Sequence, residues 1–284
     1  MKIERNFSLL IAGPDHKCVA KMVGLCKDFP AKIVISRWDN GSSQLVLPQA
    51  QFVTSPIPSV ERLNLLHNSQ NIYLQVTTVL AGLEKVDTPY VIKVRSDEFF
   101  SNIKIMAATF NPAKLLSANI FVRDVSYKPY HISDHLFIGR TDRLRNAFSA
   151  LKQYIEMASS GGGDPLGILN MQTPAEMKIA IFYLQACGYE INRLVQLCQN
   201  SAFNVMQREF DIFDVDRLCP FEISSSSAGK ITSYRKFIRW DSVLGLRHIT
   251  SIDQMAPQGK LSQLYQRLSF KLRRLLAKWC IALN

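Results

Sequence analysis

The sequence predicts an α/β protein whose central sheet is mainly parallel and flanked by helices, with a basic helical extension at its C-terminal end. Two patterns predict the sheet. Short apolar runs alternate with amphipathic segments in the first half of the chain, and the run Tyr90–Arg95 ends abruptly at the acidic residues Asp97 and Glu98. A third pattern defines the extension. From Lys230 onward there are eleven Lys and Arg residues and two acidic residues, a balance of +9 within a net charge of +11.

The predicted strands are short runs rich in β-branched and aromatic residues, bordered by turn-forming residues. The clearest is Tyr90–Arg95, where Val91, Ile92 and Val94 predict a strand buried within the sheet. In chain order, the predicted strands cover residues 7–11, 31–36, 51–54, 90–95, 117–122 and 130–139.

The segments between these runs carry apolar residues at three- and four-residue spacing, which predicts helices. One helix start is marked by Thr173 and Glu176, which form the pattern of a capping box with Pro174 at the first helical position. Glu176 therefore has a structural explanation beside any functional one. The predicted helices cover residues 15–27, 71–86, 140–157 and 173–188.

A serine-rich segment divides the chain into a predicted main domain, 1–223, and the extension, 224–284. Leucines at helical spacing and basic residues over 264–283 predict an amphipathic helix that adsorbs to an anionic bilayer. The alternative is a helix packed on the domain. Nucleic acid is not an expected partner, because the first 229 residues carry 23 basic and 21 acidic groups and no recognised nucleic-acid motif.

The composition predicts a cytoplasmic protein. No apolar run approaches the roughly 18 residues that a membrane-spanning helix needs. The short apolar run after Phe7 is better explained as a strand than as a signal peptide, because Glu4 interrupts its basic region. The six cysteines have no metal-binding spacing, which favours buried thiols in a reducing compartment.

The acidic residues after the strand Tyr90–Arg95 mark a candidate metal and phosphate site. Ligands of open α/β sheets bind beyond the carboxyl ends of the strands, where Asp97 and Glu98 lie. Adjacent carboxylates suit a hard divalent cation, Mg²⁺ or Mn²⁺. Lys93 and Arg95 share one face of the strand, where they either contact phosphate or pair with buried acids. The alternative for the whole segment is an ordinary acidic turn.

Three motifs in a fixed order connect the chain to a known family. They read Asn71-Ile-Tyr-Leu-Gln75 with Thr77-Thr78 and Gly82-Leu83, then Tyr90-Val-Ile-Lys-Val-Arg-Ser-Asp97, then His131-Ile-Ser-Asp-His-Leu-Phe-Ile-Gly139. Over residues 64–185, the chain resembles the WavE-type lipopolysaccharide synthesis family, bacterial proteins assigned to glycosyl transfer. It departs from the family's pattern at Leu74, where the family has arginine.

This resemblance implies a GT-A fold and a role in building lipopolysaccharide or capsule. It implies a nucleotide-sugar donor and a lipid-linked glycan acceptor at the cytoplasmic face of the inner membrane. In that fold, carboxylates at the end of a strand hold a metal ion that bridges the donor's diphosphate. The residues that match the family's motifs are Gln75, Lys93, Arg95, Asp97, Asp134 and His135.

Two further segments follow predicted strands, at the positions where doubly wound sheets receive a nucleotide. Gly13 follows the first strand, and Arg37, Trp38 and Asp39 follow the second. Trp38 is predicted to stack on a base, with Asp39 facing the ribose or the base edge. The alternative for Trp38 is packing on the core. Ser96 completes the residues predicted to bind the nucleotide sugar.

An inverting transfer also needs a group that takes the proton of the acceptor hydroxyl. Asp134 is the favoured candidate because His131 and His135 lie beside it, and Glu176 is the second. His131 and Asp134 are alternatively metal ligands, without a third ligand at a typical spacing. Two other functions fit the same residues. One is a different metal-dependent nucleotide enzyme, such as a nucleotidyltransferase or phosphohydrolase, and the other is a non-catalytic protein of glycan assembly.

Overall fold

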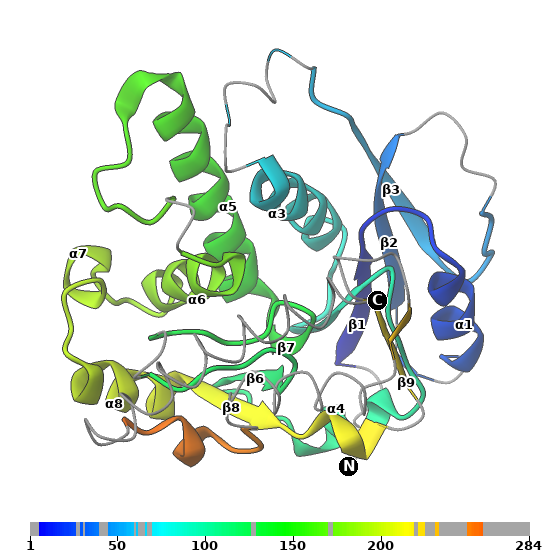
Figure 1. Cartoon of the computed structure of the whole chain (residues 1–284). Coiled ribbons are helices and arrows are strands. Elements are labelled where there is room, and N and C mark those ends of the chain that lie inside the picture. The colour runs from blue at the N-terminus through cyan, green and yellow to red at the C-terminus, as the bar shows by residue number, and fades with distance from the viewer. Residues whose placement is uncertain are drawn as a thin grey trace, which may run out of the picture.

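Seven strands form the central sheet, in the order β3-β2-β1-β4-β7-β6-β8 (Figure 1). All neighbouring strands are parallel except that β7 runs antiparallel to β4 and to β6. The predicted mainly parallel α/β sheet is therefore confirmed. The computed structural model describes residues 6–26, 29–30, 32–39, 45–59, 61, 66, 70–125, 129–169, 173–218, 221–224, 231–232 and 249–257. The strands are β1 Phe7–Ala12, β2 Lys32–Asp39, β3 Gln51–Pro56, β4 Tyr90–Arg95, β6 Leu115–Ala118, β7 Leu136–Arg140 and β8 Phe210–Phe213.

The register of the sheet aligns the ends of three parallel strands. Ala12, at the end of β1, pairs with Ser36 of β2 on one side and with Arg95 of β4 on the other. Because β7 runs in the opposite direction, its first residue, Leu136, pairs with Val94 of β4. The residues that precede β7 therefore lie beside the carboxyl end of β4.

Helices cover both faces of this sheet (Figure 1). Side chains alternate along a strand, so Leu10 and Val91 join one core with α3, α5 and α6, while Leu9 and Ile92 join the other with α1 and α4. No helix among the described residues is long and apolar enough to cross a membrane. The helices are α1 Lys17–Leu25, α3 Gln70–Leu83, α4 Ile103–Thr109, α5 Thr141–Met157, α6 Ala175–Ala186, α7 Ile191–Leu194 and α8 Gln199–Glu209, with the single turns η3 Ala158–Gly162, η4 Val215–Leu218 and η5 Ile252–Met255.

A small second sheet begins just beyond β4. Its first strand, β5 (Phe99–Phe100), pairs antiparallel with β9 (Phe221–Ser224), which pairs with β10 (Ile231–Thr232). Asp97 and Glu98 therefore occupy a short turn between two sheets. The strands on both sides fix the backbone of this turn and therefore the positions from which the two acidic side chains extend.

Two strands differ from the predicted ranges. The strand predicted over 130–139 begins only at Leu136, because Tyr130 takes a positive φ of 60° and Ser133 N donates to the side-chain Oγ of Ser117 in β6 instead of to a backbone oxygen. The strand predicted over 117–122 ends at Ala118, before Phe121 turns the chain with a φ of 61°. The residues in question, 119–122 and 130–135, are largely buried, as their apolar character predicted, but they do not form strands.

The helix that carries Glu176 also begins differently. Its first residue is Ala175, and Pro174 occupies the N-cap position without a side-chain capping hydrogen bond. Thr173 is therefore not the N-cap residue that the predicted capping box requires, while Glu176 remains an acidic residue in the first turn of α6, where its charge interacts favourably with the helix dipole. The predicted basic helix over 264–283 lies outside the described residues, as does most of the extension 224–284.

Gly82 allows α3 to pack closely on the sheet. A Cβ at this position would lie 2.3 Å from Leu10 Cδ1 and 3.0 Å from Ser36 Cβ. We therefore expect Gly82→Ala to lower the free energy of unfolding by about 1 to 3 kcal/mol in urea denaturation. The control is Gly24→Ala in α1, where a Cβ meets no atom within 4 Å, and it should raise stability by up to about 1 kcal/mol. Equal effects of the two substitutions would contradict the close approach at Gly82.

Candidate functional site

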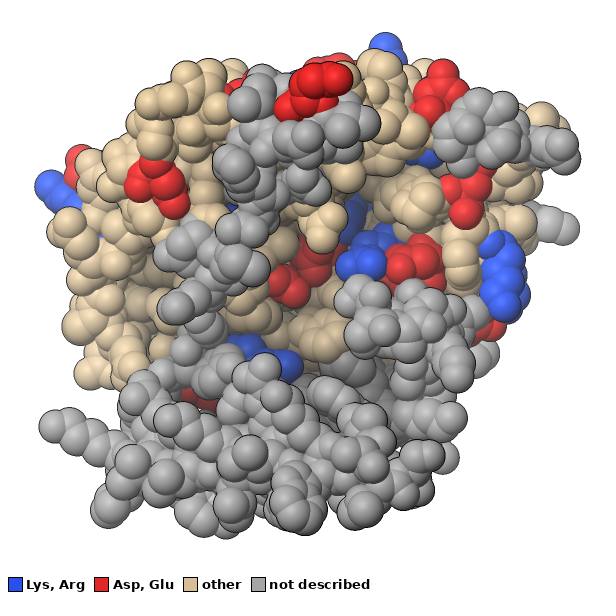
Figure 2. All heavy atoms as spheres, turned by 45° about the horizontal axis from the view of Figure 1, so that its top comes forward, with Lys and Arg blue, Asp and Glu red and all other residues tan. Residues whose placement is uncertain are grey.

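A pocket of about 530 Å³ lies at the edge where β1, β2 and β4 end, with α3 as a side wall. Figure 2 tilts this edge toward the reader and shows acidic and basic side chains gathered in a hollow near the centre of the face. Open α/β sheets bind their ligands at this position. Seven residues predicted for the site line the pocket: Gly13, Trp38, Gln75, Lys93, Arg95, Ser96 and Asp97.

Gly13 shapes the turn that follows β1. Its φ is 138°, and a Cβ there would lie 2.4 Å from Ser96 Oγ. Its N–H donates to the main-chain oxygen of Ser36 at 3.0 Å, which ties the turn to β2. Only glycine therefore fits between the strand ends. Ser96 Oγ is buried and has no hydrogen-bond partner within the described part of the chain, so it is available to a ligand.

Arg95 and Asp97 form a two-pronged ion pair at the end of β4. Arg95 Nε donates to Asp97 Oδ1 and Nη2 donates to Oδ2, each at 3.1 Å. Both side chains are partly exposed to the pocket. Lys93 is buried instead, and its Nζ donates to the main-chain oxygen of Asp134. Arg95 is thus placed to contact a ligand, whereas Lys93 holds the segment before β7 against the sheet.

Glu98 and His135 form a buried pair behind this turn. The side chain of Glu98 is 0% exposed, and its Oε1 hydrogen-bonds with His135 Nδ1. The ring of Phe121 lies 5.0 Å from the imidazole, measured between centroids. Asp97 and Glu98 were predicted as joint metal ligands, but their carboxylates have different partners: Asp97 pairs with Arg95 and Glu98 with His135.

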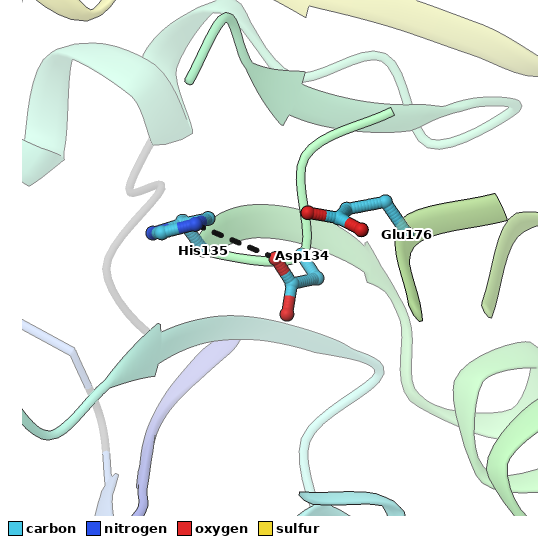
Figure 3. Close-up of side chains that lie close together, drawn as sticks. All are labelled: Asp134, His135 and Glu176. Atoms are coloured by element: carbon cyan, nitrogen blue, oxygen red, sulfur yellow. Dashed lines mark ion pairs between the residues drawn. The ribbon is translucent and has the colours of Figure 1, made fainter. Parts of the chain in front are cut away.

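Asp134 lies on the other side of the imidazole. Its Oδ2 accepts a hydrogen bond from Gln75 Nε2 of α3, and its Oδ1 lies 3.6 Å from His135 Nε2. Oδ1 is buried and accepts no hydrogen bond from any described residue. Figure 3 shows that Glu176, at the start of α6, points its carboxylate toward this pair.

The electrostatics of the cluster favour a positive charge beside two carboxylates. Burial opposes ionisation of Asp134, but the charges of His135, Lys93 and Arg95 and the hydrogen bond from Gln75 lower its pKa to about 2. Burial likewise opposes charge on His135, yet the carboxylates of Glu98 and Asp134 raise its pKa. The cluster thus stabilises positive charge on the imidazole.

The remaining ionisable groups of the cluster respond mainly to burial. Burial lowers the pKa of Lys93 to about 8. Burial, together with the negative charge of Asp134, raises the pKa of Glu176. Asp134 and Glu176 are therefore two neighbouring carboxyl groups whose pKa values move in opposite directions.

Asp134, His135 and Glu176 are the residues best placed to hold a metal ion in the described part of the chain. One ligand atom from each lies within 4.8 Å of the others. The sequence prediction had considered His131 with Asp134 and lacked a third ligand. The structure instead groups Asp134 with the adjacent His135 and with Glu176, which comes from a distant part of the chain that no spacing rule connects to them.

Arg37 and Asp39, which were predicted to bind the nucleotide, are not among the residues that line the pocket. Arg37 Nη1 donates to both carboxylate oxygens of Asp15, at 3.0 and 3.1 Å, and its guanidinium lies 4.5 Å from the centroid of the Phe52 ring. Trp38, between them, does line the pocket. Of this segment, Trp38 is therefore the residue in position to meet a ligand.

The sequence prediction missed the polar face that α3 presents to the pocket. Asn71, Gln75 and Thr78 line it together, although only Gln75 was predicted. Their spacing of four and three residues in a largely apolar helix was a usable signal. The role of Glu98 as the partner of His135 had no such signal, because it depends on the sheet register.

Comparison of the chain with models of known protein families, and with curated proteins, finds no match. Its function must therefore be inferred from the site.

Proposed function

We propose that the protein is a metal-assisted glycosyltransferase of the WavE type, which moves a sugar from a nucleotide-sugar donor to a growing lipopolysaccharide or capsular glycan. One observation carries this proposal. The residues that match the family's three motifs come from separate parts of the chain but gather in one pocket and next to it. They are Gln75, Lys93, Arg95, Asp97, Asp134 and His135.

The sheet supports a GT-A-like assignment. Renumbered within the central sheet alone, the strand order is 3-2-1-4-6-5-7, and the sixth strand is the antiparallel one. The resemblance implies carboxylates at the end of a strand as ligands of the donor's metal ion. Here Asp97 and Glu98 lie between the end of β4 and the start of β5.

The pocket suits a nucleoside diphosphate. Trp38 offers a face for the base, and the turn at Gly13 lets backbone approach the phosphates closely. Arg95 has the planar fork that binds phosphate oxygens, and Asp97 beside it is the proposed ligand for the cation that arrives with the donor. Together they would neutralise the charge that develops on the departing diphosphate.

The proton of the acceptor hydroxyl must be taken up near the sugar. Asp134 and Glu176 supply the carboxylates there. Asp134 is held by Gln75, whereas Glu176 keeps partial exposure. We expect the proton to be accepted on a carboxylate of this cluster, and an ion held there would make the acceptor hydroxyl easier to deprotonate.

The acceptor and the location follow from the same proposal. A lipid-linked glycan would reach the protein at the cytoplasmic face of the inner membrane, where the basic extension would associate with anionic lipid. The residues that carry this attraction, 264–283, lie outside the described part of the chain, and the prediction depends on their sequence alone.

Donor binding is the first test. In a thermal-shift screen of nucleoside-diphosphate sugars with Mn²⁺, the cognate donor at 100 times its dissociation constant should stabilise the protein by about 2.7 kcal/mol. Trp38→Leu should weaken the binding free energy of that donor by about 1 to 3 kcal/mol if the base stacks on the indole. Donor hydrolysis or pyrophosphate exchange without a glycan acceptor would instead identify another nucleotide enzyme. Absence of any shift with Mn²⁺ across the panel would identify a non-catalytic protein of glycan assembly.

A further inference from the structure

We propose that Asp134, His135 and Glu176 bind a divalent transition-metal ion of their own, with Glu98 as the partner that orients His135. The ligand atoms are Asp134 Oδ1, His135 Nε2 and one carboxylate oxygen of Glu176. This site is separate from the donor's cation at Asp97, and it does not require the proposed sugar transfer.

The geometry of the cluster suits such an ion. Asp134 Oδ1 and His135 Nε2 are 3.6 Å apart. Two ligands of a tetrahedral ion with bonds of about 2.0 to 2.2 Å are roughly 3.4 Å apart. A carboxylate oxygen of Glu176 lies within 4.8 Å of a ligand atom of Asp134 and of His135, and the longer, partly exposed side chain of Glu176 points toward this pair (Figure 3).

Asp134 Oδ1 is the proposed ligand atom that has no hydrogen-bond partner among the described residues. The side chain of Asp134 is 5% exposed, and among the described residues Oδ1 accepts no hydrogen bond, although Oδ2 is bonded to Gln75. Leaving a charged, buried oxygen without a partner costs more than leaving a neutral one. A cation on Oδ1 satisfies it, which neither Gln75 nor the main chain does.

Glu98 acts on His135 as the outer hydrogen-bond partner of a metal-binding histidine would. Histidines that bind metals generally donate their other ring N–H to a carboxylate or carbonyl, which fixes the tautomer and the ring orientation. Here the fully buried Glu98 bonds to Nδ1, so the lone pair of Nε2 is directed toward Asp134 and Glu176. Glu98 is a fully buried carboxylate whose one printed ion pair among the described residues is with this imidazole, which such a role explains.

The surrounding charges attract a further cation. Arg95 and Asp97 neutralise each other, and Lys93 and Arg123 act on the cluster together with the carboxylates of Glu98, Asp134 and Glu176. With a neutral imidazole, the acids outnumber the bases by one. An imidazole nitrogen among the ligands favours Mn²⁺, Co²⁺ or Zn²⁺ over Mg²⁺ and Ca²⁺. An ion here would make a bound hydroxyl easier to deprotonate.

The test is a Co²⁺ titration of the full-length protein without nucleotide, followed by visible absorption. We expect one Co²⁺ per chain, displaced by Zn²⁺ and not by Mg²⁺, without the near-ultraviolet band of a cobalt–thiolate bond. His135→Gln and Asp134→Asn should abolish this binding. Glu98→Gln should weaken it about 10- to 100-fold, because the outer partner is lost while the ligands remain.

Two further variants make the result decisive. Glu176 is partly exposed, so Glu176→Gln should fold normally and still lose the ion, even if the buried substitutions disturb folding. Asp97→Asn should leave Co²⁺ binding without nucleotide unchanged. The proposal is overturned if Co²⁺ and Zn²⁺ do not bind at millimolar concentration, if a thiolate band appears, or if Asp97→Asn removes the ion while Glu176→Gln does not. In the first case the cluster is a buried ion pair around a protonated His135.

Discussion

Asp97→Asn is expected to remove the response of the protein to its donor while leaving the fold intact. An asparagine cannot accept both prongs of Arg95, which are 3.1 Å from the two carboxylate oxygens, and it carries no charge for the donor's cation. Loss of one group that stabilises developing charge typically costs about 10² to 10³ in turnover. The measurements are the transfer rate and the thermal shift with donor and Mn²⁺.

The chain contains a matched control for this substitution. At the end of β7, Arg140 donates to Asp142 through the same two nitrogens, at 3.1 and 2.6 Å, with the same spacing in sequence. This second pair is exposed and lies away from the pocket. Asp142→Asn should therefore leave transfer and donor binding unchanged. Wild-type activity in a folded Asp97→Asn protein would place the donor site elsewhere.

Gln75→Met is expected to destabilise the protein and to impair turnover together. The substitution keeps the approximate shape of the side chain but removes the N–H that donates to Asp134 Oδ2. The side chain of Asp134 is only 5% exposed. Leaving a buried charged oxygen without its hydrogen bond should cost about 3 kcal/mol in the free energy of unfolding. Urea denaturation measures this loss, and the transfer rate reports the freed Asp134.

Gln207→Met provides the comparison. Gln207 Nε2 donates to Asp253 Oδ1 at 2.9 Å, the same pair of chemical groups, but this hydrogen bond is exposed to solvent. Because water replaces the lost donor, the cost should stay below about 0.5 kcal/mol. Similar losses in the two variants would show that burial of Asp134 does not decide the stability effect.

Much of the fold was predictable because it depends on local patterns. Val91, Ile92 and Val94 predicted a central strand, and the acids after it predicted where the sheet ends. The polar face of α3 was readable in the same way, from the helical spacing of Asn71, Gln75 and Thr78, although only Gln75 was predicted. These inferences hold because side-chain periodicity and turn residues act over a few positions.

The errors came from segments whose conformation depends on distant parts of the chain. The buried residues before β7 were predicted as strand, but Tyr130 turns the backbone and Ser133 bonds to Ser117 instead. The capping box at Thr173 was equally plausible locally, yet α6 begins at Ala175 without it. Burial and local propensity did not distinguish these outcomes, because packing against other segments selected among them.

By itself, the sequence determined the alternation of strands and helices, the acidic end of β4 and the basic extension. Only the tertiary structure decided which carboxylates share a site. The antiparallel direction of β7 places Asp134 and His135 beside the end of β4, and the start of α6 adds Glu176 from a distant part of the chain. The register of the sheet and the packing of α6 consist of long-range contacts. Hydrophobic burial selects these contacts, and because it is non-directional, no local sequence pattern specifies which segments meet.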